Sequence, residues 1–274
     1  MNAPKTLPDC FDAACHAQNT QAAKEIPDVT VDTTVEQFFD SPFTVEDIDD
    51  TKVEIQKHPS NSAAGIEEIH YKEIVKMDSV KLCHLINLCI STRACPTTWI
   101  VSILIGILKR YKPSDDPNSY RTICLESCML EFVTLLIMRR VIKWADLRKL
   151  IPPSQNGFRK DYRTNNNAFI LRCAIEKAKA MGKTLYVATV DITNAFPSTD
   201  HATLWLKLKM LGMSGKLFDW IRMIYALMQY KVRHENEFSD PFGADIGIMI
   251  GDTLSPEFWI LYMADFEIPP TADQ

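Results

Sequence analysis

A short apolar run that ends in an acidic residue constrains the fold of this chain more than any other segment. Residues 184–190 read Thr-Leu-Tyr-Val-Ala-Thr-Val, a run rich in β-branched residues that follows Met181-Gly182-Lys183 and predicts a buried strand. Asp191 ends this run, and Phe196 follows five residues later. A carboxylate at a sheet edge is well placed to hold a divalent cation, and the aromatic ring could floor a nucleotide pocket. The alternative, that Asp191 only caps a strand-to-helix turn, is about equally compatible with this segment alone.

Length and composition indicate a globular protein with one large core or two modest ones. The chain has 274 residues, of which 46% are hydrophobic and 24% are charged. Its longest apolar stretches, Ile100–Leu108 and Met129–Met138, are shorter than the roughly 18 residues of a membrane span. The N-terminus lacks the charged-then-apolar layout of a secretory signal. We therefore expect an intracellular protein, nuclear or cytoplasmic, with no membrane segment.

The cysteines do not form a zinc-binding pattern. The eight cysteines are scattered and include no Cys-x-x-Cys pair. In a chain of this length without a secretory signal, we expect reduced thiols.

Charge is distributed unevenly along the chain. The formal net charge is −5, but residues 1–50 hold two lysines and eleven acidic residues. Residues 101–163 hold twelve basic and six acidic residues. The basic centre could follow a phosphate backbone or bind a triphosphate, and an ordinary solvated surface is an equally good reading of the charge alone.

The chain is organised as a polar leader followed by mixed helices and strands. Residues 1–34 are acidic and aperiodic, and we expect them to be disordered. Thr44, with Asp47 three residues later, predicts a helix start. Further helices are expected over 69–75, 80–89, 128–147, 164–178, 200–211 and 214–228, and further strands over 100–108, 120–125, 230–237 and 243–250.

Five segments, in order along the chain, resemble the reverse transcriptases of non-LTR retrotransposons. They are Ser62-Ala-Ala-Gly65, the stretch from Pro96-Thr-Thr-Trp99 through Lys109 to Asn118-Ser-Tyr120-Arg121, Gln155-Asn-Gly157-Phe158-Arg159, Asp191–Phe196 with His201 beyond, and Gly247–Pro256. The last two resemble the first and second palm motifs of the family. Each motif is weak alone, but their common order over about residues 44–267 makes coincidence improbable. The resemblance implies an α+β fold of the right-hand polymerase type, mostly helical with short antiparallel strands, with N-terminal helices and fingers over 35–182 and a partial palm over 183–274.

The resemblance implies RNA-directed DNA synthesis from an RNA template, a DNA primer and deoxynucleoside triphosphates. Such a reaction uses two Mg²⁺ ions about 3.5–4 Å apart. By the resemblance, Asp191 is the catalytic residue and bridges the ions, and the carbonyl of Ile192 is a further ligand.

The same resemblance assigns four nucleotide-binding residues, each with a structural alternative. Lys109 and Arg121 would neutralise the triphosphate, or they are surface charges near a turn. Phe196 would lie beneath the sugar, or it is a core aromatic. Gly251 would let the backbone approach the nucleotide, or it is a hairpin glycine.

The chain also departs from the family pattern. Ile250 replaces a glutamine, Thr253 replaces a proline, and Pro197 replaces an acidic residue. The family's Asp-Asp turn is missing before Gln274, since Met263-Ala-Asp265 has one aspartate and follows the second palm motif too closely. We expect no independent polymerase activity. A residual RNA or primer–template binding module and a decayed, non-functional remnant remain as alternatives.

Overall fold

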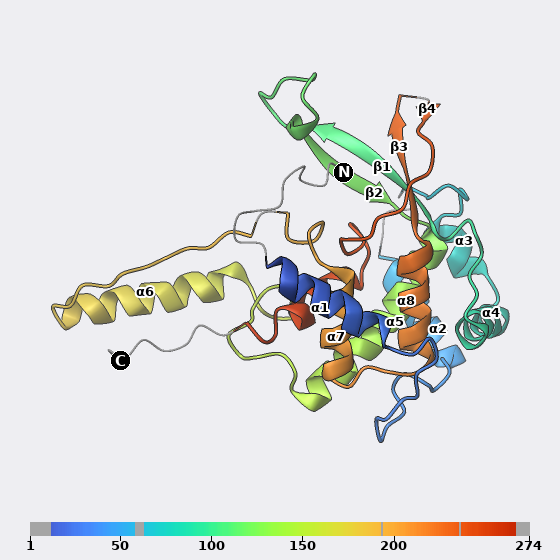
Figure 1. Cartoon of the computed structure of the whole chain (residues 1–274), viewed down its shortest axis with the longest axis horizontal. Coiled ribbons are helices and arrows are strands. Elements are labelled where there is room, and N and C mark those ends of the chain that lie inside the picture. Colours follow the sequence, from blue (N-terminus) through green and yellow to red (C-terminus); the bar gives the residue numbers. More distant parts are fainter. Residues whose placement is uncertain (1–11, 58–62, 193, 236, 267–274) are drawn as a thin grey trace.

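Most of the regular secondary structure is helical, and a small sheet lies at one end of the helical body (Figure 1). This computed structural model describes residues 12–57, 63–192, 194–235 and 237–266. The helices are α1 (Ala13–Lys24), α2 (Val45–Ile55), α3 (Tyr71–Lys76), α4 (Ser79–Thr92), α5 (Cys128–Arg148), α6 (Thr164–Ala180), α7 (His201–Met210), α8 (Lys216–Leu227) and α9 (Ser255–Tyr262). The strands are β1 (Val101–Leu108), β2 (Tyr120–Leu125), β3 (Gln229–His234) and β4 (Glu237–Phe238). The predicted α+β class is confirmed. In the parts of the chain that the structure describes, no helix is both long and apolar enough to cross a membrane.

The core of the helical body is built around α5. Most of the apolar side chains of α5 are buried, and Trp144, which is 1% exposed, meets Phe39 edge-on at a ring-centroid distance of 5.2 Å. Helices α2 and α9 pack on α5, and α4 packs on α2 and α8. Pairing of a buried aromatic edge with a ring face adds to the hydrophobic stabilisation of this body.

The sheet joins two segments that are far apart in the sequence. Its strand order is β2-β1-β3-β4, with β1 antiparallel to β2 and parallel to β3. Ile107 lies opposite Arg121 in the hairpin, and Ile103 lies opposite Lys231 across the parallel pair. The predicted strands 100–108 and 120–125 are therefore confirmed, because each finds a partner. Of the strands predicted over 230–237 and 243–250, the first forms β3, which pairs with β1 and the short β4. The second does not form a strand, and its one bridge joins Ile246 to Asp200.

The expected disorder of residues 1–34 is wrong where the structure describes this leader, from residue 12 onward. Residues 13–24 form α1, which packs along α7, and the carboxylate of Asp12 caps it by accepting from the backbone N–H of Cys15 at 2.8 Å. Asp32 is 3% exposed and accepts from the backbone N–H groups of Thr34 and Phe39. The acidic side chains thus satisfy backbone donors at turns and caps, a role that net charge does not reveal. Residues 1–11 lie outside the described part of the chain.

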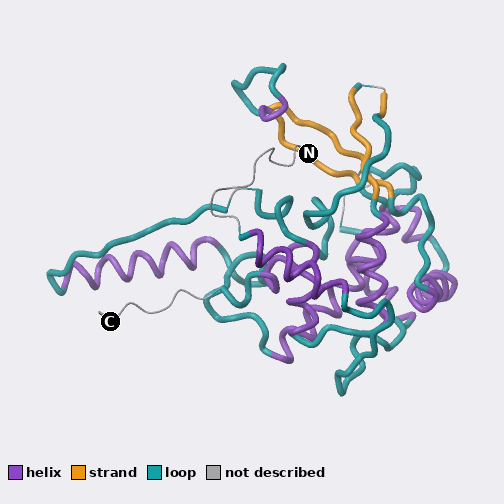
Figure 2. The backbone as a smooth tube through the Cα atoms, in the orientation of Figure 1, coloured by secondary structure: helices purple, strands orange, loops and turns teal. Residues whose placement is uncertain are grey.

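The run 184–191 does not form the predicted strand. Helix α6 points away from the body, and the chain turns at Gly182 and returns as an extended segment (Figure 2). We call residues 164–192 the arm. The return segment is exposed throughout, with Tyr186 at 90% and Val190 at 83%. A strand requires a neighbour to satisfy its backbone hydrogen bonds, and none of the described strands pairs with this segment.

Candidate functional site

The end of the first palm motif (Asp191–Phe196) lies beside the start of the second (Gly247–Pro256). The backbone N–H of Ile248 donates to the carbonyl oxygen of Phe196 at 3.0 Å, and that of Gly247 donates to Thr199 at 2.7 Å. These bonds connect segments about fifty residues apart in the sequence. The sequence analysis predicted that both segments belong to one site, and the structure brings them into contact.

Gly247 makes this approach possible. Its φ is +96°, and a Cβ atom at this position would lie 3.1 Å from the carbonyl oxygen of Pro197 and 3.2 Å from its Cα. A side chain would therefore meet backbone atoms in a conformation that L-residues rarely adopt. The absence of a side chain at Gly247 is what lets the two motif segments touch.

His201 holds the same two segments together from the first turn of α7. Its Nε2 donates to the carbonyl oxygen of Gly247 at 2.6 Å, and its ring meets Tyr225 edge-on at 5.3 Å. Burial lowers the pKa of the imidazole below its usual value. A neutral imidazole with its proton on Nε2 satisfies this bond, so His201 acts as a structural tie between the motifs.

Phe196 lies in a group of aromatic rings at this junction. Its ring centroid is 5.9 Å from that of Phe158 and 5.9 Å from that of Trp259. Phe158 has a φ of +57° and is 62% exposed, so one side of the group faces solvent. Phe196 itself is partly buried against the core. This packing suits a nucleotide floor and a core aromatic alike.

Gly251 lies over the end of β2. Its φ is +99°, and an added Cβ would lie 3.3 Å from the carbonyl oxygen of Cys124. Arg121 is three residues earlier on β2, which is about 10 Å along a strand. Lys109 continues β1 beyond its pair with β2, and its Nζ donates to the carbonyl oxygen of Asn118 at 2.9 Å. Lys109, Arg121 and Gly251 therefore lie along one hairpin.

Asp191 and Ile192 belong to the arm and not to the hairpin. Both are exposed at the end of the arm, and residue 193, the next in the motif, lies outside the described residues, as does Ser62 of the most upstream motif. Among the ion pairs of the described residues, none joins Asp191 to Lys109 or Arg121. The roles assigned to Asp191 and Ile192 stay predictions.

The described residues do not form a complete magnesium site. Within 12–57, 63–192, 194–235 and 237–266, no three His, Cys, Asp or Glu side chains come together as metal ligands. Asp191 offers one exposed carboxylate, whereas a two-ion site needs ligands for both cations. The donor set therefore does not fit a pair of Mg²⁺ ions.

A buried pair of acids, which the sequence analysis missed, lies beneath Gly251. Asp252 is 3% exposed, and its Oδ1 accepts from the backbone N–H of Leu254 at 2.8 Å. Burial raises the pKa of Asp252 to about 7, and burial together with the charge of Asp252 raises the pKa of Glu126 well above its usual value. With both groups ionised, neither oxygen of Glu126 has a hydrogen-bond donor in the described chain, so one shared proton stabilises the pair. The sequence signal was available, since Asp252 belongs to the second motif and Glu126 directly follows a strand.

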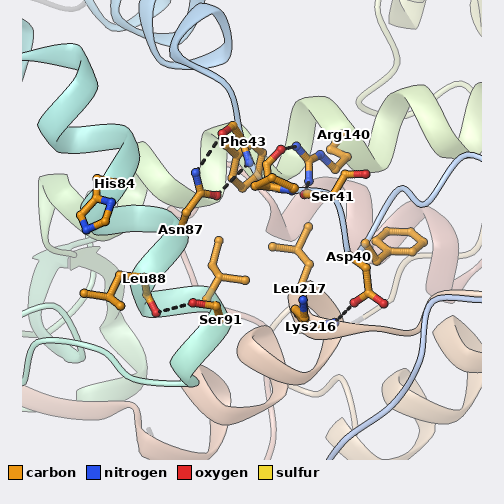
Figure 3. Close-up of a pocket in the computed structure, with 13 residues that line it drawn as sticks. Asp40, Ser41, Phe43, His84, Asn87, Leu88, Ser91, Arg140, Lys216 and Leu217 are labelled. Carbon is orange, nitrogen blue, oxygen red and sulfur yellow. Dashed lines mark hydrogen bonds between the residues drawn. The ribbon is translucent and has the colours of Figure 1, made fainter.

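One surface hollow lies outside this site. It has a volume of about 300 Å³ and lies between the loop at residues 39–43, α4 and the start of α8 (Figure 3). Asn87 donates to the carbonyl oxygen of Phe43 at 2.8 Å, and Arg140 donates to that of Ser41 at 2.5 Å. These side chains hold the loop in place, and none of the predicted site residues lines the hollow.

Comparison with known proteins agrees with the motifs. The family described as reverse transcriptase (RNA-dependent DNA polymerase) matches residues 107–272. A probable RNA-directed DNA polymerase from transposon BS of Drosophila melanogaster is 25% identical over 231 residues, which cover 83% of this chain and 25% of the relative. The RNA-directed DNA polymerase from the mobile element jockey of Drosophila funebris is 25% identical over 82% of this chain and 24% of the relative.

A third relative comes from another element. The Pol polyprotein of the type-2 retrotransposable element R2DM of Drosophila melanogaster is 24% identical over 81% of this chain and 20% of the relative. The chain thus spans about a quarter or less of the length of these relatives. The family match covers more than half of the chain and includes β2, the arm and the two motifs at Asp191–Phe196 and Gly247–Pro256, so the chain belongs to the reverse transcriptase family, in the group that serves non-LTR retrotransposons.

Proposed function

We propose that this chain supplies the fingers and the first part of the palm of a retrotransposon reverse transcriptase. In this proposal the N-terminal helices and the fingers extend over residues 35–182 and the palm begins at 183. The observation that carries the proposal is the contact between Phe196 and Ile248, which joins the two palm motifs beside the β1–β2 hairpin. The names of the relatives support RNA-directed DNA synthesis as the ancestral reaction.

The hairpin supplies the proposed contacts to phosphate. Lys109 and Arg121 carry positive charge at one end of β1 and β2, and Gly251 leaves the backbone open near the other end. The ammonium group of Lys109 donates one of its three N–H groups to the carbonyl oxygen of Asn118. The other two donors remain for a triphosphate or a nucleic-acid backbone. Phe196 would lie under the sugar of the nucleotide. We propose these four residues as the nucleotide-binding set.

We further propose that the chain alone binds primer and template without extending the primer. Asp191, with the Ile192 carbonyl, would offer one carboxylate and one carbonyl to Mg²⁺, which stabilises the charge of nucleotidyl transfer when it is bound. The described residues supply no complete ligand set around Asp191. Binding through the hairpin does not depend on that set.

Primer extension tests the catalytic part of this proposal. The 274-residue chain is mixed with an RNA template, a DNA primer and deoxynucleotides, in Mg²⁺ and separately in Mn²⁺. We expect incorporation by the wild type to equal that of Asp191→Ala and of buffer alone. Incorporation by the wild type that Asp191→Ala abolishes would show an active enzyme and would refute the claim of inactivity.

Filter binding at graded salt tests the binding part. Each phosphate contact releases counterions, so affinity should fall steeply between about 50 and 200 mM salt. Arg121→Gln and Lys109→Gln should each reduce the slope of log affinity against log salt by about one, the value expected for one lost phosphate contact. Lys209→Gln, on the exposed end of α7 away from the hairpin, is the matched control and should leave the slope unchanged. A slope near zero for the wild type would refute binding.

A further inference from the structure

The two buried acids flank the contact between the second palm motif and the hairpin. Gly251 lies over β2, where an added Cβ would be 3.3 Å from the carbonyl oxygen of Cys124. Asp252 directly follows Gly251, and Glu126 is two residues after Cys124. The two acids are 3% and 6% exposed. Their charge therefore acts at the point where the turn that carries Gly251 meets β2.

The backbone of Glu126 is held from two sides. Glu126 directly precedes Ser127, whose hydroxyl caps α5 by accepting from a backbone N–H of the first turn at 3.2 Å. On another side, a Cβ at Gly65 would lie only 2.6 Å from the carbonyl oxygen of Glu126. Glu126 therefore has little room to move, and a repulsion within the pair displaces the turn that carries Gly251 and Asp252.

Asp252 organises that turn through its own backbone and side chain. Its Oδ1 accepts from the backbone N–H of Leu254 at 2.8 Å, and its carbonyl oxygen accepts from the N–H of Ser255, where α9 begins, at 3.3 Å. Its Oδ2 and both side-chain oxygens of Glu126 are buried, and no donor of the described chain reaches them. A proton on one carboxyl supplies the donor that the pair needs.

The groups around the pair add no positive charge. The titratable side chains that face it come from five elements and are Tyr71 of α3, Cys124 of β2, Glu131 of α5, Tyr225 of α8 and Tyr230 of β3. Glu67 lies close to the backbone of Glu126, since its Oε2 is 2.8 Å from the Cβ position of Gly65. All of these groups are neutral or negative. Loss of the shared proton would leave two buried like charges side by side, which the turn relieves by moving away from β2.

We propose that Glu126 and Asp252 are positioning residues for nucleic-acid binding, and that Gly251 stays over β2 only while the two acids share a proton. Both acids are buried, so they act on the nucleic acid through the backbone at Gly251. Because Gly251 is one of the four proposed nucleotide-binding residues, this role rests on the proposed function. The consequence is that the affinity for primer–template falls as the pair loses its proton.

Filter binding of the full chain to a DNA primer annealed to an RNA template, at one salt concentration from pH 6 to pH 8, tests this role. Burial raises the pKa of Asp252 to about 7, so the fraction of the protein that holds the proton falls from about nine tenths at pH 6 to about one tenth at pH 8. We expect the dissociation constant of the wild type to rise about tenfold over this range, because only the protonated fraction binds.

Two amide variants separate the pair from every other titrating group. Asp252→Asn and Glu126→Gln each give the pair a permanent N–H donor and only one negative charge. Each should keep, up to pH 8, the affinity that the wild type has at pH 6. Glu46→Gln, the same exchange at an exposed position of α2, is the matched control and should follow the wild type. All histidines remain in these proteins, so a pH effect that came from histidine would persist in the amide variants.

The outcomes distinguish this role from the proposed function. Binding by the wild type with equal affinity at pH 6 and pH 8 would overturn the role of the pair and leave the proposed function intact. Absence of binding at every pH would refute the proposed function itself. If the amide variants unfold at higher temperature at pH 8 but bind with the pH profile of the wild type, the pair is only structural and the proposal fails. Far-UV circular dichroism at each pH checks folding, and either amide variant alone is sufficient if the other folds poorly.

Discussion

The β1–β2 hairpin and the arm start from similar sequence and reach different structures. Residues 101–108 and 184–190 are both short apolar runs rich in β-branched residues. The first becomes β1 because β2 and β3 satisfy its two edges. The second stays extended and exposed because no described strand lies beside it. The local sequence preference therefore permits an extended conformation, and a neighbouring strand that pairs with its backbone is needed to make it a β-strand.

Substitution in the body and in the arm should give the largest contrast. Trp144→Ala removes a side chain that is 1% exposed and packed on Phe39, and it should lower the free energy of unfolding by about 3–5 kcal/mol. Tyr186→Ala, at 90% exposure, should change it by less than about 0.5 kcal/mol. Urea denaturation at low protein concentration measures both. Similar losses for the two variants would mean that the arm is packed in solution.

The same contrast explains which parts of the fold the sequence could predict. The helix begun by Thr44 depends on a capping residue three positions away, and the 120–125 strand pairs with the strand directly before it in the sequence; both were predicted correctly. The parallel pairing of β1 with β3 joins segments more than a hundred residues apart, and nothing in either strand specifies that partner. The disorder predicted for the leader failed because Asp12 and Asp32 bind backbone donors.

The candidate site was predictable only in its parts. The order of the motifs correctly indicated the family, and the structure joins Phe196 to the second motif. The sequence could not show that Asp191 would be left on the arm, because its place depends on a strand partner. Nor could it show that Glu126 and Asp252 are buried together, since burial of an acid depends on tertiary packing.

The buried acids make the body, and not the arm, sensitive to pH. The pKa of Asp252 is raised by burial from its usual 3.8 to about 7, so the folded protein takes up a proton between these values. The unfolded chain binds fewer protons in this window. The contribution of this group to the free energy of unfolding is therefore fully present below about pH 4 and is lost as pH rises toward 7. We expect a loss on the order of 3 kcal/mol across this range from the pair, measured by urea denaturation at several pH values.

Glu126→Gln should flatten this dependence. The amide removes the buried carboxyl whose own pKa is raised by burial and by the charge of Asp252, while Glu131, which also raises the pKa of Asp252 and accepts from the hydroxyl of Tyr71, remains. The variant should therefore gain stability at pH 8 relative to the wild type. Glu237→Gln, on the exposed strand β4, is the control and should leave the pH profile unchanged. An unaltered profile in Glu126→Gln would show that the pair is not the source.

Gly247→Ala tests the junction of the two palm motifs at a smaller expected effect. The new methyl group would meet Pro197 at 3.1 Å in a backbone conformation with φ at +96°, so we expect a loss of about 1–3 kcal/mol. Gly157→Ala is the matched control, because nothing lies within 4 Å of its added Cβ. Thermal unfolding distinguishes the two. Equal melting temperatures would mean that the motif contact is loose.

The smallest expected effect concerns the cap of α6 and sharpens the comparison of arm and body. Helix α2 begins with a capping box in which Thr44 and Asp47 exchange hydrogen bonds, whereas Arg163 at the start of α6 makes no side-chain cap bond. Arg163→Ser would add an acceptor for the free N–H groups of the first turn, which stabilises a helix by about 0.5–1 kcal/mol. Because α6 lies outside the core, we expect slower hydrogen exchange in α6 with an unchanged global unfolding free energy. A rise in global stability of the same size would instead show that the arm unfolds together with the body, and the distinction between the two regions would fail.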